Sequence, residues 1–147
     1  MNSDFKNLLL SLQKFNVHYL IVGGYAVIHY SQPRYTKNFD LWIQPSSENA
    51  NKLMLALADF DIPLKGITTE DFTTEGTQFS IGVPPCEIDF LTTIPGLKFP
   101  TAWQNKEICT ANEFPAHYVS KQDLITAKKT AGRPQDLADI DELNRTP

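Results

Sequence analysis

The 147-residue chain has the length of one domain and carries a formal net charge of −4. Its 41% hydrophobic and 20% charged residues are typical of a globular protein that buries a core without disulfides or a structural metal. The negative net charge excludes a domain-wide basic surface, so we expect no binding of extended DNA. Cys86 and Cys109 are too few for a disulfide framework, and we expect both to be reduced, buried thiols.

The N-terminal segment has neither a signal-peptide pattern nor a membrane-spanning pattern. Its apolar run, residues 8–10, is short, and Asp4 lies where a signal peptide would be positively charged. The longest later apolar stretch, residues 19–28, contains two glycines and is shorter than a membrane span. We therefore expect a cytoplasmic protein without membrane contact.

Helices alternate with strands in the first half of the chain. Apolar residues at helical spacing predict an amphipathic helix capped by Ser3, and a nearly continuous apolar run then predicts a buried strand. Gly23 and Gly24 end that strand, and a short helix follows that stops before Pro33. The expected elements are a helix over residues 3–15, a strand over 17–22, a helix over 25–30, a strand over 38–44 and a helix over 47–59.

The second half predicts two strands and a C-terminal helical hairpin. Pro84 and Pro85 separate the strands, as in a hairpin, and Ser120 and Gly132 bound the first helix. Pro134 begins the second helix. Residues 62–75 show no clear pattern. The expected elements are strands over residues 77–83 and 86–91, proline-rich loops up to 115, and helices over 121–131 and 134–143. The fold class is therefore α/β, with a small mixed sheet flanked by helices in one domain.

Gly23 and Gly24 lie where the first predicted strand meets a helix. Paired glycines at a strand end permit positive φ angles and let a phosphate approach the backbone, while the helix N-terminus offers free N–H groups and a positive dipole. An ordinary tight turn also explains the pair, so this segment alone identifies no function.

Two otherwise apolar strands carry polar side chains on one face. Side chains alternate along a strand, so Asn38 and Asp40 share a face, and so do Glu87 and Asp89. Embedded carboxylates are costly unless they are solvated, paired or bound to a cation. Carboxylates from adjacent strands suit Mg²⁺ bound together with substrate phosphates. The pattern indicates a site for phosphoryl or nucleotidyl transfer, or strand-end carboxylates that simply face solvent.

The segment YLIVGGYAVIHYSQPRYTKNFDLWI resembles the opening of the minimal nucleotidyltransferase superfamily: a strand, Gly-Gly or Gly-Ser, a helix, then Asp-x-Asp or Asp-x-Glu. Gly23 and Gly24 take the glycine positions, and Asn38 and Asp40 take the two acidic positions. In CEIDFL, Asp89 takes the position of the third family carboxylate. The resemblance implies a nucleotidyltransferase-like fold that transfers a nucleoside monophosphate from an NTP to an RNA or protein hydroxyl. It also implies that Mg²⁺ is the cofactor, with Asn38, Asp40 and Asp89 as its ligands.

The C-terminal segment LITAKKTAGRPQDLADIDEL resembles the last helices of a bacterial subgroup linked to abortive infection and toxin–antitoxin systems. In related toxins a lysine and an aspartate of this region assist catalysis, which would correspond to Lys128 and to Asp136 or Asp139. A salt-bridge set within the helical hairpin is the alternative. The resemblance implies an NTP and a cognate toxin or antitoxin protein, or a tRNA, as partners.

Arg34 and Lys37 precede the acidic strand and are candidates for binding triphosphate oxygens. A solvated loop is the alternative for this basic pair.

Asn38 departs from the family pattern, which has aspartate at this position. An amide oxygen can contact Mg²⁺, but it brings no negative charge and cannot bridge two cations. The loss of one carboxylate contact would lower the rate by a factor of ~10² or more. Asn38 therefore marks either a natural pseudo-enzyme or a change from an active parent, and Glu87, on the face of Asp89, would compensate in part.

Three functions follow from these observations. The first is a Mg²⁺-dependent nucleotidyltransferase, weakened by Asn38. The second is a catalytically inactive protein of the same fold that serves as the antitoxin or regulatory partner of a toxin. The third is an α/β protein with acidic strand ends and no nucleotide site.

Overall fold

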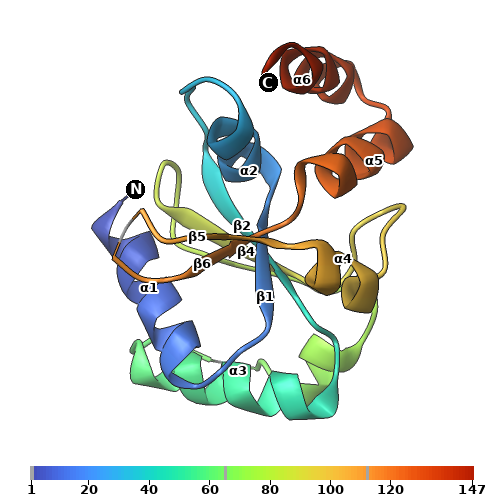
Figure 1. Ribbon diagram of the computed structural model, residues 1–147. Helices are drawn as coiled ribbons and strands as arrows, with labels where there is room; N and C mark the ends of the chain where they lie inside the picture. The colour runs from blue at the N-terminus through green and yellow to red at the C-terminus, as the bar shows by residue number, and fades with distance from the viewer. Residues whose placement is uncertain (1, 65, 112) are drawn as a thin grey trace.

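The computed structural model describes residues 2–64, 66–111 and 113–147. Within these residues a six-stranded mixed sheet forms the centre of the molecule (Figure 1). The strands are β1 (Tyr19–Val22), β2 (Asn38–Ile43), β3 (Gln78–Ile81), β4 (Glu87–Leu91), β5 (Glu107–Cys109) and β6 (Ala116–Tyr118). Their order is β3-β4-β2-β1-β6-β5, with β2–β4 and β1–β6 parallel and the other neighbours antiparallel.

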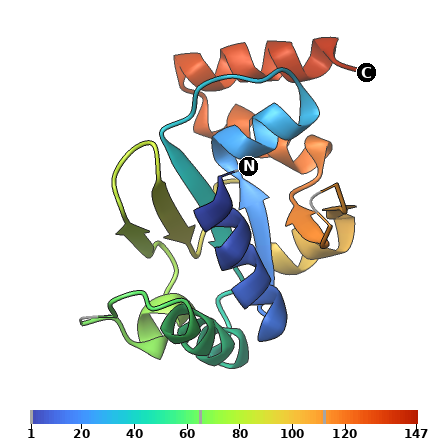
Figure 2. The same cartoon turned by 90° about the vertical axis from the view of Figure 1, so that its left-hand side faces the viewer.

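Six α-helices of the described residues flank this sheet. Figures 1 and 2 show α2, α5 and α6 together at one end of the sheet and α3 at the opposite end. The helices are α1 (Ser3–Lys14), α2 (Gly23–Tyr30), α3 (Ser47–Asp59), α4 (Phe99–Asn105), α5 (Lys121–Ala131) and α6 (Pro134–Arg145), with a short 3₁₀ helix, η1 (Thr69–Thr73). The mixed α/β class and the C-terminal helical hairpin are as the sequence predicts. Among the described residues, no helix is long and apolar enough to cross a membrane.

The two faces of the sheet are covered by different helices because side chains alternate along β2. Phe39 points to the face of α1, where its ring stacks on that of Phe5 with centroids 4.6 Å apart. Trp42 points to the opposite face and meets Phe99 of α4 edge-on at 5.0 Å. Asp40 has the same parity as Trp42. It therefore lies on the α4 side, near the end of the sheet that α2, α5 and α6 cover.

Several sequence predictions need correction. Asn2, not Ser3, caps α1, because its side-chain oxygen accepts a hydrogen bond from the backbone N–H of Asp4 at 2.7 Å. Cys86 is exposed and Cys109 is half-buried, so the prediction of two buried thiols is wrong, although both are free.

The segment expected to be proline-rich loop contains α4 and β5. Proline in the first turn starts α4 instead of breaking it, since the first N–H groups of a helix have no intrahelical partner. β5 has only three residues, too few to show a period.

Two histidines flank Trp103 at the end of the sheet remote from α5 and α6. The His18 ring stacks on the indole at 4.1 Å, and the His117 ring meets it edge-on at 5.0 Å. Burial lowers the pKa of both histidines below 6.5. The unfolded chain therefore takes up protons near pH 6.5 while the folded chain does not, and the free energy of unfolding falls as pH drops below about 6.5.

We expect the melting temperature to fall by a few degrees between pH 7.5 and 5.5 because of these two groups. His117→Phe, which keeps an aromatic ring but cannot be protonated, should show a smaller fall than the unmodified protein. Differential scanning calorimetry at both pH values measures the difference. Equal falls in the two proteins would contradict the assignment.

Candidate functional site

Asn38, Asp40 and Asp89 converge at the start of β2 and β4. The two strands are parallel and in a register that places Asn38 opposite Glu87 and Asp40 opposite Asp89. The Asn38 side-chain Nδ2 donates hydrogen bonds to Asp40 Oδ1 and to Asp89 Oδ2, both at 2.5 Å. The two carboxylates therefore face each other across a single amide group.

Gly23 and Gly24 permit close approach of side chains at the start of α2. A Cβ on Gly23, whose φ is +67°, would lie 2.1 Å from Asp40 Oδ2, and one on Gly24 would lie 2.5 Å from Thr36 Oγ1. Both distances are shorter than van der Waals contact, so no larger residue fits without displacing these groups. Val22, which precedes α2, has no side chain that could cap its first N–H groups.

The carboxylates of this site repel one another. Asp89 is only 4% exposed, and among the described residues its Oδ1 has no hydrogen-bond partner. Burial, together with the charge of Asp89, raises the pKa of Asp40 to about 7. The nearby Asp89 carboxyl also raises the pKa of Glu87. The site is rich in negative charge, and the uncharged Asn38 amide is the group that holds the Asp40–Asp89 pair.

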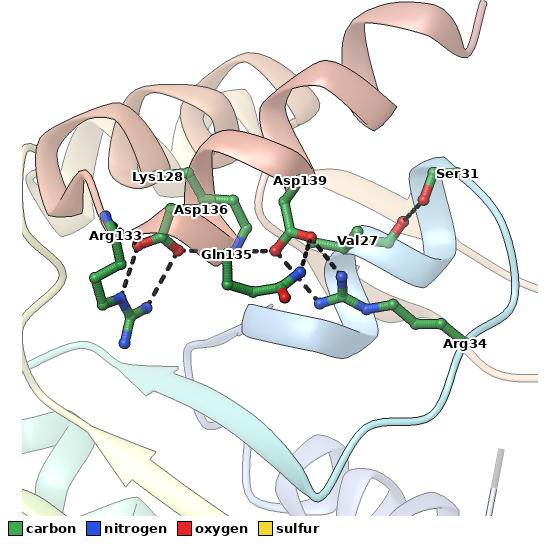
Figure 3. A network of polar contacts seen from close by, with 8 residues as sticks. All are labelled: Val27, Ser31, Arg34, Lys128, Arg133, Gln135, Asp136 and Asp139. Atoms are coloured by element: carbon green, nitrogen blue, oxygen red, sulfur yellow. Dashed lines mark hydrogen bonds and ion pairs between the residues drawn. The ribbon is translucent and has the colours of Figure 1, made fainter.

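A second set of charges joins α5, α6 and the loop before β2 (Figure 3). Lys128 of α5 contacts Asp136 at 3.3 Å and Asp139 at 2.9 Å, and both aspartates are almost fully buried. Arg34 pairs with Asp139, and Gln135 donates to the same carboxylate at 2.8 Å. We call these five residues, together with Arg133, the hairpin charge cluster.

Hydrogen bonds within the hairpin charge cluster keep its aspartates ionised. The Arg133 guanidinium holds the pKa of Asp136 down to about 2, through a 2.7 Å contact from Nε. Burial alone would raise the pKa of Asp139, but hydrogen bonds from Arg34, Lys128 and Gln135 outweigh it and lower that pKa. Arg133 also donates its backbone N–H to Asp136, which closes the turn between α5 and α6. The structure therefore shows the salt-bridge set that was the alternative for this segment.

A polar cleft of about 680 Å³ separates the carboxylate site from the hairpin charge cluster. The glycines of α2 form one wall, the loop before β2 another, and α5 and α6 a third. The residues that line it are Gly23, Gly24, Arg34, Tyr35, Thr36, Lys37, Asn38, Asp40, Lys128, Arg133, Gln135, Asp136 and Asp139. The candidate residues Arg34, Lys37 and Lys128 thus border the same cleft as Asn38 and Asp40. Asp89, behind Asn38, lies outside this lining.

Some residues of the cleft were not identified from the sequence. Thr36 packs against Gly24, and Gln135 orients Asp139. Threonine in a loop and glutamine at a helix start carry no signal of their own, whereas the neighbouring Arg34 and Lys37 stand out by their charge.

Comparisons with known proteins give no family for this chain. Neither the family models nor the curated proteins contain a match. Within the described residues, no group of three or more His, Cys, Asp or Glu side chains is arranged to hold a metal ion. A cation at this site would therefore depend on Asp40 and Asp89, with Asn38 as an uncharged neighbour.

Proposed function

We propose that the chain binds Mg²⁺–NTP in the polar cleft and transfers the nucleoside monophosphate to a hydroxyl of RNA or protein, slowly because of Asn38. The supporting observation is the pair of facing carboxylates, Asp40 and Asp89, beside the glycine-started helix α2. Cationic side chains border the cleft beside this pair. An anionic substrate bound through a cation needs carboxylates that hold the cation and cationic side chains that contact the remaining phosphate oxygens.

The chemistry of the carboxylate pair suits a hard cation. Asp89 Oδ1 is buried without a hydrogen-bond partner among the described residues, and carboxylate oxygens are the ligands that Mg²⁺ prefers. When bound, Mg²⁺ would neutralise phosphate charge and activate the attacking hydroxyl. Asp40 and Asp89 would hold it, and the Asn38 amide would have to turn away from at least one of them.

The remaining steps fall to the chain's own residues. The free N–H groups at the start of α2, with Arg34 and Lys37, would bind the phosphates. Asp40 Oδ2, which lies beside Gly23 at the edge of the cleft, would accept the proton of the acceptor hydroxyl.

Asn38 favours a second candidate, an inactive protein of this fold that acts as the partner of a toxin or antitoxin. Its amide donates to both carboxylates, so it stabilises the pair without any cation. An enzyme that binds a cation at this place would not need these two hydrogen bonds to stabilise the carboxylates.

Binding of Mg²⁺–NTP distinguishes the two candidates. Isothermal titration with each NTP should show binding that requires Mg²⁺ and disappears in Asp89→Asn. Asp141→Asn, an exposed position on α6, is the matched control and should bind normally. Incubation with labelled NTP and total cell RNA and protein then tests transfer. The proposal fails if no NTP binds in the presence of Mg²⁺, or if NTP binds equally well without Mg²⁺.

A further inference from the structure

An apolar pocket adjoins the polar cleft and has no role in the function proposed so far. One wall is a single face of α5, because Leu124, Ala127 and Ala131 recur at helical spacing. The opposite wall is the segment after β4, with Ile94 and Leu97. The pocket has a volume of about 160 Å³. We refer to it as the apolar pocket.

The apolar pocket opens beside the candidate reaction centre. Gly23, Asp40 and Lys128 line both the pocket and the polar cleft. Leu91, which also lines the pocket, lies two residues after Asp89 on β4, so the pocket borders the face of the sheet that carries the carboxylates. A group in the pocket would therefore lie next to a phosphate bound through a cation at Asp40.

The size of the pocket matches an aromatic ring. An apolar protein cavity of about 150 Å³ binds benzene, and the present pocket is of that size. The group attached to the reacting phosphate of an NTP is a nucleoside, whose base is a flat aromatic ring. The size of the pocket and its continuity with the cleft thus both favour a nucleobase as the occupant.

The pocket lacks groups that could read the edge of a base. Among the described residues that line it, none has a hydroxyl or amide side chain. Its charged side chains are already paired: Lys128 and Arg133 contact Asp136, which also lines the pocket, and Asp40 accepts from Asn38. A base would be held by packing against aliphatic side chains, without hydrogen-bond recognition.

We infer that the apolar pocket is a nucleobase subsite that binds by packing alone and does not distinguish bases of equal ring size. This inference rests on the proposed function. Sites that hydrogen-bond a substrate group reject analogues by factors of 10⁴ to 10⁵. Here we expect CTP and UTP to differ in affinity by less than about threefold, and likewise ATP and GTP, because only their hydrogen-bonding groups differ.

Filling the pocket tests the inference. Ala127→Leu places a larger side chain on the pocket wall, and Ala138→Leu, exposed on α6, is the matched control. Isothermal titration would measure the affinity of each protein for Mg²⁺–NTP and for Mg²⁺–tripolyphosphate, which has no nucleoside. We expect Ala127→Leu to weaken NTP binding by about tenfold, the discrimination typical of a small volume change in an apolar pocket. Tripolyphosphate binding should stay unchanged, and Ala138→Leu should change neither. Ala131→Leu, on the same face of α5, replaces Ala127→Leu if the latter does not fold.

Each other outcome identifies which part is wrong. Unmodified protein that binds neither NTP nor tripolyphosphate overturns the proposed function, and the subsite with it. Equal binding of NTP and tripolyphosphate, or NTP binding that Ala127→Leu leaves unchanged, overturns the subsite alone. A clear preference, above about threefold, between CTP and UTP or between ATP and GTP overturns recognition by packing.

Discussion

Replacing Asp139 with alanine should lower the free energy of unfolding by about 3–5 kcal/mol, the usual cost of removing one partner from a buried ion pair. The Asp139 carboxylate is 3% exposed. It forms ion pairs with Arg34 and Lys128 and accepts a hydrogen bond from Gln135. Without it, Lys128 keeps only Asp136, and Arg34 loses its carboxylate partner. Contact between α6 and the loop before β2 would be lost as well, so the cleft would open on that side.

Urea-induced unfolding measures this effect. Asp141→Ala, an exposed aspartate two residues further along α6, is the control and should stay within about 0.5 kcal/mol of the unmodified protein. A loss of less than 1 kcal/mol for Asp139→Ala would show that the hairpin charge cluster adds little to stability.

The lowered pKa of Asp136 also predicts that the folded protein loses stability at acidic pH. The folded pKa of Asp136 is about 2, below its ordinary value of 3.8. The stabilisation from this group is therefore complete above about pH 4 and is lost as pH falls toward 2.

The first and last parts of the fold follow from the sequence because their signals are local. β1 is a continuous apolar run broken by Gly23, and the boundary between α5 and α6 is fixed by Gly132 and Pro134. Arg34 and Asp139 meet across 105 residues of chain. No local pattern encodes that contact, and only the resemblance of the last two helices to a known subgroup pointed to Lys128 and to Asp136 or Asp139 as part of the site.

The candidate site follows from the sequence only in part. The two-residue period of a strand places Asn38 with Asp40 on one face. The parallel register that brings Asp89 opposite Asp40 depends on the arrangement of the whole sheet, as does the bond from Asn38 to Asp89. The apolar pocket is lined by segments that are distant in the sequence, such as those around Gly23, Leu91 and Leu124, and its aliphatic side chains look like ordinary core in the sequence.

Asn38→Asp should convert the carboxylate site into one that requires a cation. The change replaces an amide that donates to both Asp40 and Asp89 with a third carboxylate at the same place. Without Mg²⁺, the lost hydrogen bonds and the added repulsion should lower the free energy of unfolding by about 1–3 kcal/mol. With Mg²⁺, stability should return, because bound cation stabilises the folded state by mass action.

The same variant should bind Mg²⁺–NTP more tightly and transfer nucleotide faster, by a factor of ~10² or more, since a third carboxylate would neutralise a second cation. The two measurements are the melting temperature with and without Mg²⁺ and the yield of labelled RNA or protein. Asn38→Ala, which removes the amide without adding charge, separates loss of the hydrogen bonds from gain of a ligand, and it should lose stability and respond to Mg²⁺ less than Asn38→Asp does. Asp40→Asn should abolish whatever cation binding the unmodified protein has. If Asn38→Asp neither responds to Mg²⁺ nor yields labelled product, position 38 is not the missing ligand, and the partner-binding function becomes the better account of this fold.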